Sequence, residues 1–304
     1  MKSKYLIVIV GPTAVGKTDF SLKLAKKFDT EIISADSRQF FKETEIGTAK
    51  PTQEERQQVR HHFVDSLSIT DPYDVGDFEK DVLLLLQKLF KSVDVVVMTG
   101  GSGLYVKAVC EGLDQMPDVD PDIRMNLNRL FETAGIQMLQ EKLLQVDPEY
   151  YAKVDLQNPQ RLIRALEVWE ATGRPFSSFR VKQTQQRPFE IIKIGLERDR
   201  EKLYERIDER MDLMISQGLF EEARLLFDQR KLNALQTVGY SEIFGYLEGK
   251  YDKEEAVRFL KRNSRRYAKR QLTWFKKDSE IKWFSLDEEE GIWQYLSQRI
   301  PIKL

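Results

Sequence analysis

The sequence YLIVIVGPTAVGKT, residues 5–18, decides the fold. Its first part, Tyr5–Val10, is an uninterrupted apolar run, which predicts a strand buried on both faces. Its second part matches the pattern G-x-x-x-x-G-K-[ST] and consists of Gly11, Pro12, Thr13, Ala14, Val15, Gly16, Lys17 and Thr18. Because this motif follows an apolar strand and opens a predicted helix over residues 18–27, it has the context that a phosphate-binding loop requires.

The chemistry of such a loop explains its residue types. Successive backbone N–H groups and the start of a helix form a cradle for anions. Gly11 and Gly16 let the backbone turn and approach the phosphates, Lys17 adds positive charge, and the Thr18 hydroxyl is placed to bind Mg²⁺. The loop does not specify its ligand, because a diphosphate fits the cradle as well as a nucleoside triphosphate does.

The first 110 residues alternate between strand and helix patterns. Residues 31–35 and 93–98 have the pattern of strands, and residues 77–91 between them have that of a helix. Strands separated by helices imply a parallel sheet with right-handed crossovers. We therefore predict the α/β class, with a P-loop NTPase-like parallel sheet as the core.

A change of pattern near Leu113 divides the chain. Residues 114–188 are mainly helical in pattern, a strand pattern returns at 189–196, and the remainder is mostly helical. The economical interpretation is a catalytic core made of residues 1–113 and 189–304, with a helical C-terminal region. An all-helical insertion, residues 114–188, interrupts this core.

Composition excludes several classes of protein. The 304 residues include 48 Lys+Arg and 49 Asp+Glu, and no apolar run approaches the ~20 residues that span a bilayer. The N-terminus lacks a signal-peptide pattern. The single cysteine, Cys110, rules out an internal disulfide, and one cysteine with two histidines argues against a zinc site. We expect a cytoplasmic protein with no membrane partner.

Residues at the ends of the later strands supply further candidate chemistry, because ligands of open parallel sheets bind at the carboxyl ends of the strands. Asp36 follows the second strand, where its carboxylate can accept a proton from an attacking hydroxyl or amine, or help to bind a metal. An Asx-turn or helix cap is the structural alternative. The third strand ends in Thr99-Gly100 without the Walker B aspartate of most NTPases, which disfavours a motor or switch ATPase.

Residues 258–277 contain nine basic residues and no acidic ones. At helical spacing these form a basic stripe opposite an apolar one, which predicts an amphipathic helix with a polyanion-binding face. The rest of the chain then carries a net charge of −10, so the near-neutral total conceals a local basic surface. A membrane surface is the minor alternative partner. The candidate phosphate contacts are Arg265, Arg266, Lys269 and Arg270.

Eight blocks of sequence together resemble one family, the bacterial tRNA dimethylallyltransferases, also called tRNA isopentenyltransferases. The blocks, in chain order, are GPTAVGKT, SADSRQF, IGTAKP, HHFVD, TGGSGLY, NPQRLIRALEV, VGYSEI and RRYAKRQLTWF. The resemblance extends over about residues 7–284. The resemblance implies transfer of a dimethylallyl group from dimethylallyl diphosphate to N6 of the adenosine just 3′ of the anticodon in tRNA.

The resemblance also implies roles for individual residues. Residues 13–18 would hold the diphosphate substrate, with Thr18 near Mg²⁺, and Asp36 would be the general base for the adenosine N6. Either Arg206 or Arg210 would steady the leaving diphosphate, and we favour Arg210. The implied tRNA contacts are Asp36, Ser37, Arg38, Gln39, Ser102, Arg124, Gln160, Arg161, Leu162, Ile163 and Arg164. One departure is that the VGY block lacks the flanking arginines of some relatives and has Gln236, Thr237 and Ser241.

Two other functions remain open on the residues alone. A P-loop small-molecule kinase using ATP would also need the loop and Asp36, but not the basic helix or the insertion. A nucleic-acid-binding module with a vestigial loop would leave Lys17, Thr18 and Asp36 unexplained. The favoured interpretation is a monomeric transferase whose partners are the tRNA anticodon stem-loop, dimethylallyl diphosphate and Mg²⁺.

Overall fold

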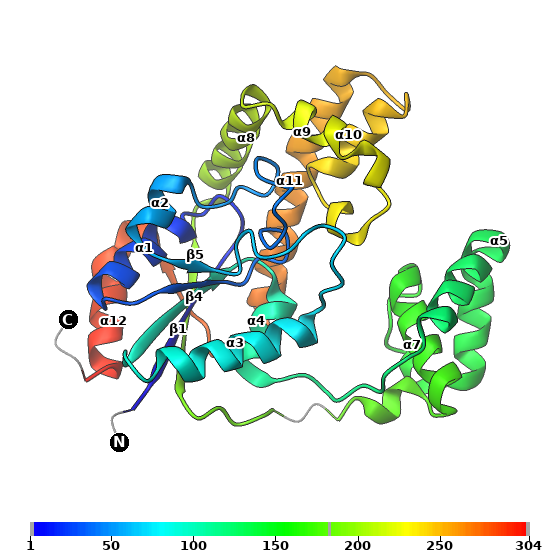
Figure 1. Ribbon diagram of the computed structural model, residues 1–304, viewed down its shortest axis with the longest axis horizontal. Helices are drawn as coiled ribbons and strands as arrows, with labels where there is room; N and C mark the ends of the chain where they lie inside the picture. Colours follow the sequence, from blue (N-terminus) through cyan, green and yellow to red (C-terminus); the bar gives the residue numbers. More distant parts are fainter. Residues whose placement is uncertain (1–2, 182–183, 302–304) are drawn as a thin grey trace. The chain divides into compact units, whose positions relative to one another are not determined.

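A computed structural model describes residues 3–181 and 184–301 (Figure 1). Its sheet has six strands in the order β3-β2-β4-β1-β5-β6, and every neighbouring pair is parallel. The strands are β1 (Tyr5–Val10), β2 (Ile32–Ser34), β3 (His61–His62), β4 (Val95–Gly100), β5 (Glu190–Glu197) and β6 (Lys282–Ser285). The predicted parallel α/β sheet is therefore confirmed.

The central strand β1 explains the layering of the sheet. Since β4 and β5 flank it and helices cover both faces, all six of its residues are buried. Alternate side chains enter different cores: Leu6, Val8 and Val10 belong to one cluster, and Tyr5, Ile7 and Ile9 to the other. The continuous apolar run in the sequence is a direct consequence of this double burial.

Nine α-helices accompany the sheet within the described residues. One hydrophobic cluster joins it to helices that include α3, α4, α10 and α11, and the other joins it to α1 and α12. The helices are α1 (Lys17–Lys27), α2 (Gln53–Gln58), α3 (Val75–Leu89), α4 (Gly103–Glu111), α8 (Arg200–Ser216), α9 (Leu219–Leu225), α10 (Tyr240–Leu247), α11 (Lys253–Phe275) and α12 (Glu289–Arg299). No helix in the described part of the chain is long and apolar enough to cross a membrane.

The chain divides into two compact units. One consists of residues 1–111 and 186–304, and the other of residues 112–185. The second unit contains α5 (Pro121–Val146), α6 (Pro148–Tyr151) and α7 (Pro159–Thr172), and its own core includes Leu139 and Leu166. Gly135, at φ 77°, interrupts α5 and divides it into two helical parts.

The two ends of the second unit lie against each other. The side-chain amide of Gln185 donates to the carbonyl of Leu113 at 3.5 Å, and a Cβ atom at Gly112 would come within 2.7 Å of the Gln185 side chain. The unit is thus an insertion whose chain leaves and returns at one place.

Candidate active site

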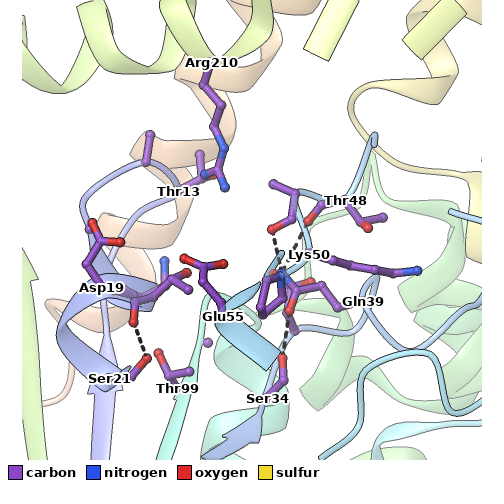
Figure 2. A pocket seen from close by; sticks show the side chains of 18 of the residues that line it. Thr13, Asp19, Ser21, Ser34, Gln39, Thr48, Lys50, Glu55, Thr99 and Arg210 are labelled. Carbon is purple, nitrogen blue, oxygen red and sulfur yellow. Dashed lines mark hydrogen bonds between the residues drawn. The ribbon is translucent and has the colours of Figure 1, made fainter. Parts of the chain in front are cut away.

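A cavity of about 480 Å³ lies at the carboxyl ends of β1, β2 and β4. Figure 2 shows Thr13 and Asp19 on one side of it, Gln39 and Thr48 on the other, and Arg210 reaching in from above. Its volume is typical of a small-molecule site. The sequence motifs that follow the three strands therefore meet in one place, as the sheet rule predicts.

The phosphate loop forms one wall of this cavity. Thr13, Ala14, Gly16, Lys17 and Thr18 line it, whereas Gly11, Pro12 and Val15 do not. Gly16 has φ 113°, and α1 begins directly after it with no side-chain cap, so the first N–H groups of the helix are available to an anion. Gly11 is needed for a different reason: a Cβ atom there would lie 2.6 Å from the carbonyl oxygen of Leu196.

Lys17 is half-buried in the loop and bonded to it. Its Nζ donates to the carbonyls of Gly11 (3.0 Å) and Pro12 (2.9 Å). Burial lowers the pKa of Lys17 to about 8; the Asp36 carboxylate opposes this shift, and the Arg210 charge adds to it. A bound anion would supply the negative charge that this desolvated ammonium lacks.

Two arginines of α8 approach the loop differently. Arg210 is half-buried, and its Nη1 lies 3.4 Å from the Thr13 hydroxyl; desolvation lowers its pKa, and Asp36 opposes the shift. Arg206 is more exposed, and its Nε donates to the Ala14 carbonyl at 3.0 Å. Both arginines line the cavity; Arg206 also supports the loop backbone, whereas Arg210 meets the loop through the Thr13 hydroxyl.

The carboxylate of Asp36 forms a turn with its own backbone and also lines the cavity. Its Oδ1 accepts the backbone N–H of Arg38 at 3.0 Å, which is an Asx-turn, and the side chain also lines the cavity. Ser102 secures the same segment, because its Oγ accepts the N–H of Ser37 at 3.0 Å. One carboxylate oxygen is thus fixed by the turn, and no hydrogen bond within the described residues holds Oδ2.

The other predicted residues of this segment, Arg38 and Gln39, are occupied by protein contacts. The Arg38 guanidinium donates to the carbonyls of Asn233 (2.6 Å) and Ala234 (3.1 Å). Gln39 lines the cavity, and its amide donates to the carbonyls of Thr48 and Ala49. Both residues therefore tie neighbouring loops to the Asp36 segment.

Sequence reasoning missed two cavity residues on α11, Tyr267 and Gln271. Gln271 is 5% exposed; its Oε1 accepts the N–H of Thr13 (2.8 Å), and its Nε2 donates to the carbonyl of Gly101 (3.0 Å). Burial, aided by Asp36, raises the pKa of Tyr267. The sequence did contain a signal for them: Tyr267 and Gln271 are uncharged and lie one helical turn apart within the basic run.

The predicted residues of the insertion converge on one buried acid. Arg124 donates from Nη1 to both oxygens of Glu167 (3.2 Å each) and from Nη2 to the Gln160 side chain (3.1 Å), and Arg164 also pairs with Glu167. Glu167 is 1% exposed. This acid compensates the charge of two arginines, whereas Arg161 has no acidic partner among the described residues.

Two of the predicted tRNA contacts are wrong as side-chain contacts. Leu162 and Ile163 are both 0% exposed and belong to the core of the insertion. Their spacing on α7 places them on its buried face, so they support the helix and cannot touch a ligand outside the unit.

The basic face of α11 is only partly free. Arg265 is half-buried, and its Nη1 donates to both oxygens of Asp208 on α8 (2.6 and 2.5 Å). Arg266, Lys269 and Arg270 are exposed and have no ion pair in the part of the chain that the structure describes. At i, i+3 and i+4 these three lie on one side of the helix, and we call them the α11 patch.

The two histidines, Asp94 and Cys110 make contacts within the fold, and His61 also lines the cavity. His62 pairs with Glu31, and the Nδ1 of His61 contacts the Val59 carbonyl at 2.9 Å. Asp94 pairs with Lys4 at the amino end of β4, the end of the sheet opposite the cavity. Burial raises the pKa of the Cys110 thiol to about 12, which makes it an inert core residue.

Comparisons with known proteins agree with this arrangement. A family model described as IPP transferase matches residues 39–278. The tRNA dimethylallyltransferase of Christiangramia forsetii is 57% identical over 299 residues, with 98% of this chain and 99% of the relative covered. The chain belongs to the IPP transferase family. The tRNA dimethylallyltransferase of Cytophaga hutchinsonii is 54% identical, with 98% of each chain covered.

Solved structures of IPP transferases share the fold. The tRNA isopentenylpyrophosphate transferase of Bacillus halodurans is 38% identical, with a TM-score of 0.73, 99% of this chain covered and 97% of that chain. The P-loop NTPase-like core is thus the family fold. The family resemblance inferred from the eight sequence blocks is confirmed.

Proposed function

We propose that this chain transfers the dimethylallyl group of dimethylallyl diphosphate to N6 of the adenosine 3′-adjacent to the anticodon of tRNA, releasing diphosphate. One observation carries the proposal: a cradle for phosphate, Lys17, Arg210 and the carboxylate of Asp36 all line one cavity. Relatives of nearly equal length bear the name of this activity.

The phosphate wall assists departure of the leaving group. As the bond between the allylic carbon and oxygen breaks, negative charge grows on the diphosphate. The groups that would stabilise this charge are the N–H groups at the start of α1, the Lys17 ammonium and the Arg210 guanidinium, all of which line the cavity. Donors held in place by the fold stabilise a developing charge more than solvent does, because they need not reorganise during the reaction.

Asp36 assists the acceptor, which is the N6 amine of the adenosine. The exocyclic amine of adenine is a weak nucleophile that loses a proton as the new C–N bond forms, so a nearby carboxylate assists the step. The Asx-turn through Oδ1 fixes the orientation of Asp36 and leaves Oδ2 to receive this proton. The base must leave its stack to reach the cavity, as in other enzymes that modify bases.

The residues present fit a Mg²⁺ ion held mainly by the diphosphate. Thr18 lines the cavity next to Lys17, and the Thr99 hydroxyl, also in the lining, is buried without a hydrogen-bond partner within the described residues. We propose that Thr18 ligates Mg²⁺ and that Thr99 bonds to a water of its shell, because Mg²⁺ keeps several waters when it binds phosphates. The ion would neutralise charge on the leaving diphosphate.

We assign tRNA backbone binding to the α11 patch and to Arg161, whose charges have no acidic partner among the described residues. The arginines paired with Glu167 would contribute only if RNA displaced that pairing. A monomer in the cytoplasm completes the proposal, supported by the tRNA substrate named for the relatives and by the single buried cysteine.

The decisive experiment is a transfer assay with labelled dimethylallyl diphosphate, Mg²⁺ and an unmodified anticodon stem-loop, with ATP omitted. We expect label on the RNA. Absence of label, together with phosphate transfer from ATP to a small metabolite, would establish the kinase alternative. Asp36→Ala should reduce turnover far more than RNA affinity, and equal losses in both would make Asp36 a binding residue.

A further inference from the structure

The blocks IGTAKP (46–51) and VGYSEI (238–243) lie far apart in sequence and meet at one side chain, Glu222 of α9. Its Oε2 accepts the backbone N–H groups of Glu45 (3.0 Å) and Ile46 (2.8 Å). Its Oε1 accepts the N–H of Gly47 (2.9 Å) and the hydroxyl of Tyr240 (2.6 Å). One carboxylate therefore binds four donors, three of them consecutive in the chain.

Tyr240 contributes both a hydrogen-bond donor to Glu222 and a steric requirement for glycine at position 47. The residue is fully buried, and burial together with the Glu222 charge raises its pKa, so the hydroxyl stays protonated and donates. A Cβ atom at position 47 would lie 2.6 Å from the Tyr240 ring. Gly47 is thus required because the loop backbone passes directly over the ring.

The segment held by Glu222 leads directly into a wall of the cavity. Thr48, Ala49 and Lys50 line the cavity, and Ala49 has φ 49°, a left-handed conformation that a residue with a Cβ adopts only under constraint. On the cavity side, the Gln39 amide donates to the carbonyls of Thr48 (3.3 Å) and Ala49 (3.2 Å). Residues 45–50, which we call the wall loop, are therefore held from opposite sides by Gln39 and Glu222.

The wall loop does not belong to the phosphate cradle. Figure 2 shows Thr48 and Gln39 across the cavity from Thr13 and Asp19. Gln39 also belongs to the Asp36 segment, so the wall loop is continuous with the side of the cavity that carries the general base. Its position affects the acceptor side more than the diphosphate side.

We propose that Glu222 is a positioning residue for prenyl transfer: it fixes the wall loop, and through it the site of the acceptor base beside Asp36. This inference rests on the proposed function. Glu222 itself does not line the cavity, so it acts through the loop backbone. Losing it would displace the acceptor while the diphosphate cradle stays intact.

Glu222→Gln is the sharpest test, since it keeps the shape but directs an amide NH₂ at groups that are all donors. We expect kcat for stem-loop prenylation to fall about 10- to 100-fold, because a misplaced reactant costs that much. The KM for dimethylallyl diphosphate should stay within about twofold, since the cradle is untouched. Glu221→Ala, at an exposed neighbouring position on α9, is the matched control and should match wild type.

Tyr240→Phe provides a second test that preserves the packing. It removes one of four donors and should lower kcat about fivefold with the same unchanged KM, in line with the loss of one hydrogen bond. If thermal unfolding shows that Glu222→Gln does not fold, the kinetics of Tyr240→Phe test the inference instead. Unchanged kcat, or a rise in the KM for the diphosphate that matches the loss of kcat, would overturn the inference. A wild-type protein without prenyl transfer would instead refute the proposed function.

Discussion

The cations of the cavity and those of the α11 patch carry the same charge in opposite environments. Lys17 and Arg210 are half-buried in the cavity wall, and desolvation lowers the pKa of each. Arg266, Lys269 and Arg270 are exposed on α11 and make no ion pair within the described residues. Because Coulomb interactions are strong in a buried site and screened at a surface, the first pair should control chemistry and the second group should control affinity.

Removing a cavity cation should have the largest effect. For Arg210→Ala we expect kcat to fall about 10²- to 10³-fold, as for the loss of one pre-positioned donor to a developing charge. Single-turnover measurement at saturating RNA isolates this step. Arg206→Ala is the control, because Arg206 bonds to the Ala14 carbonyl and is more exposed, and its loss should be several-fold smaller. Equal losses would mean that both arginines contact the diphosphate.

The pKa of Lys17 should make diphosphate binding depend on pH. The unliganded group titrates at about 8, and a bound anion raises this value, so affinity is full below pH 8 and declines as the pH rises above it. At pH 8, binding of dimethylallyl diphosphate should take up about half a proton at Lys17. Calorimetry in buffers of different ionisation enthalpy measures this uptake. Lys17→Met should abolish it, and an uptake that survives this substitution would assign it to another group.

The α11 patch should act through salt dependence. Changing Arg266, Lys269 and Arg270 together to Gln should lower the slope of log K against log salt by about 2 for a single-stranded or loop RNA, since each phosphate contact contributes about 0.7. Turnover at saturating RNA should stay near wild type. Filter binding at several salt concentrations measures the slope. A triple variant with the wild-type slope would remove this face of α11 from the RNA interface.

Substitution of Arg265 should have the smallest effect, and it should change the stability of the fold rather than RNA binding. Its ion pair with Asp208 is about one-third exposed, so the coupling energy should be only about 0.2–1 kcal/mol of unfolding free energy. A double-mutant cycle of Arg265→Ala and Asp208→Ala in urea gives this energy. The salt slope of RNA binding should hardly change for Arg265→Ala. A slope change as large as that of Arg266→Ala would show that RNA displaces Asp208.

Local features of the molecule could be predicted from sequence alone. Strand β1 has the bounds that its apolar run predicts, and α7 (Pro159–Thr172) lies in the segment whose pattern is helical. Both elements carry their signals within their own residues: double burial in β1, and a capping Asn158 with a terminal Gly173 in α7. Strand β3 was missed because two residues are too few to form a pattern.

Features that depend on distant partners could not be predicted. Gln271 reaches Thr13 across more than 250 residues of chain, and no spacing rule brings the two together. The same holds for Glu222 and the wall loop. The basic run likewise could not separate Arg265 from Arg266, because the difference lies in Asp208 on another helix. The burial of Leu162 and Ile163, in contrast, could have been predicted from sequence, because the apolar residues of α7 recur at helical spacing.

The contact between Gly112 and Gln185 at the two ends of the insertion has a consequence for how the molecule assembles. Strand β1 must pair with both β4 and β5, although about ninety residues separate these two strands. Once the insertion has folded with its ends together, the tether joining β4 to β5 shortens to about fifteen residues, which lowers the entropic cost of closure by about 1.6 kcal/mol. An insertion that folds early would thereby speed the pairing of β1 with β4 and β5 in the core.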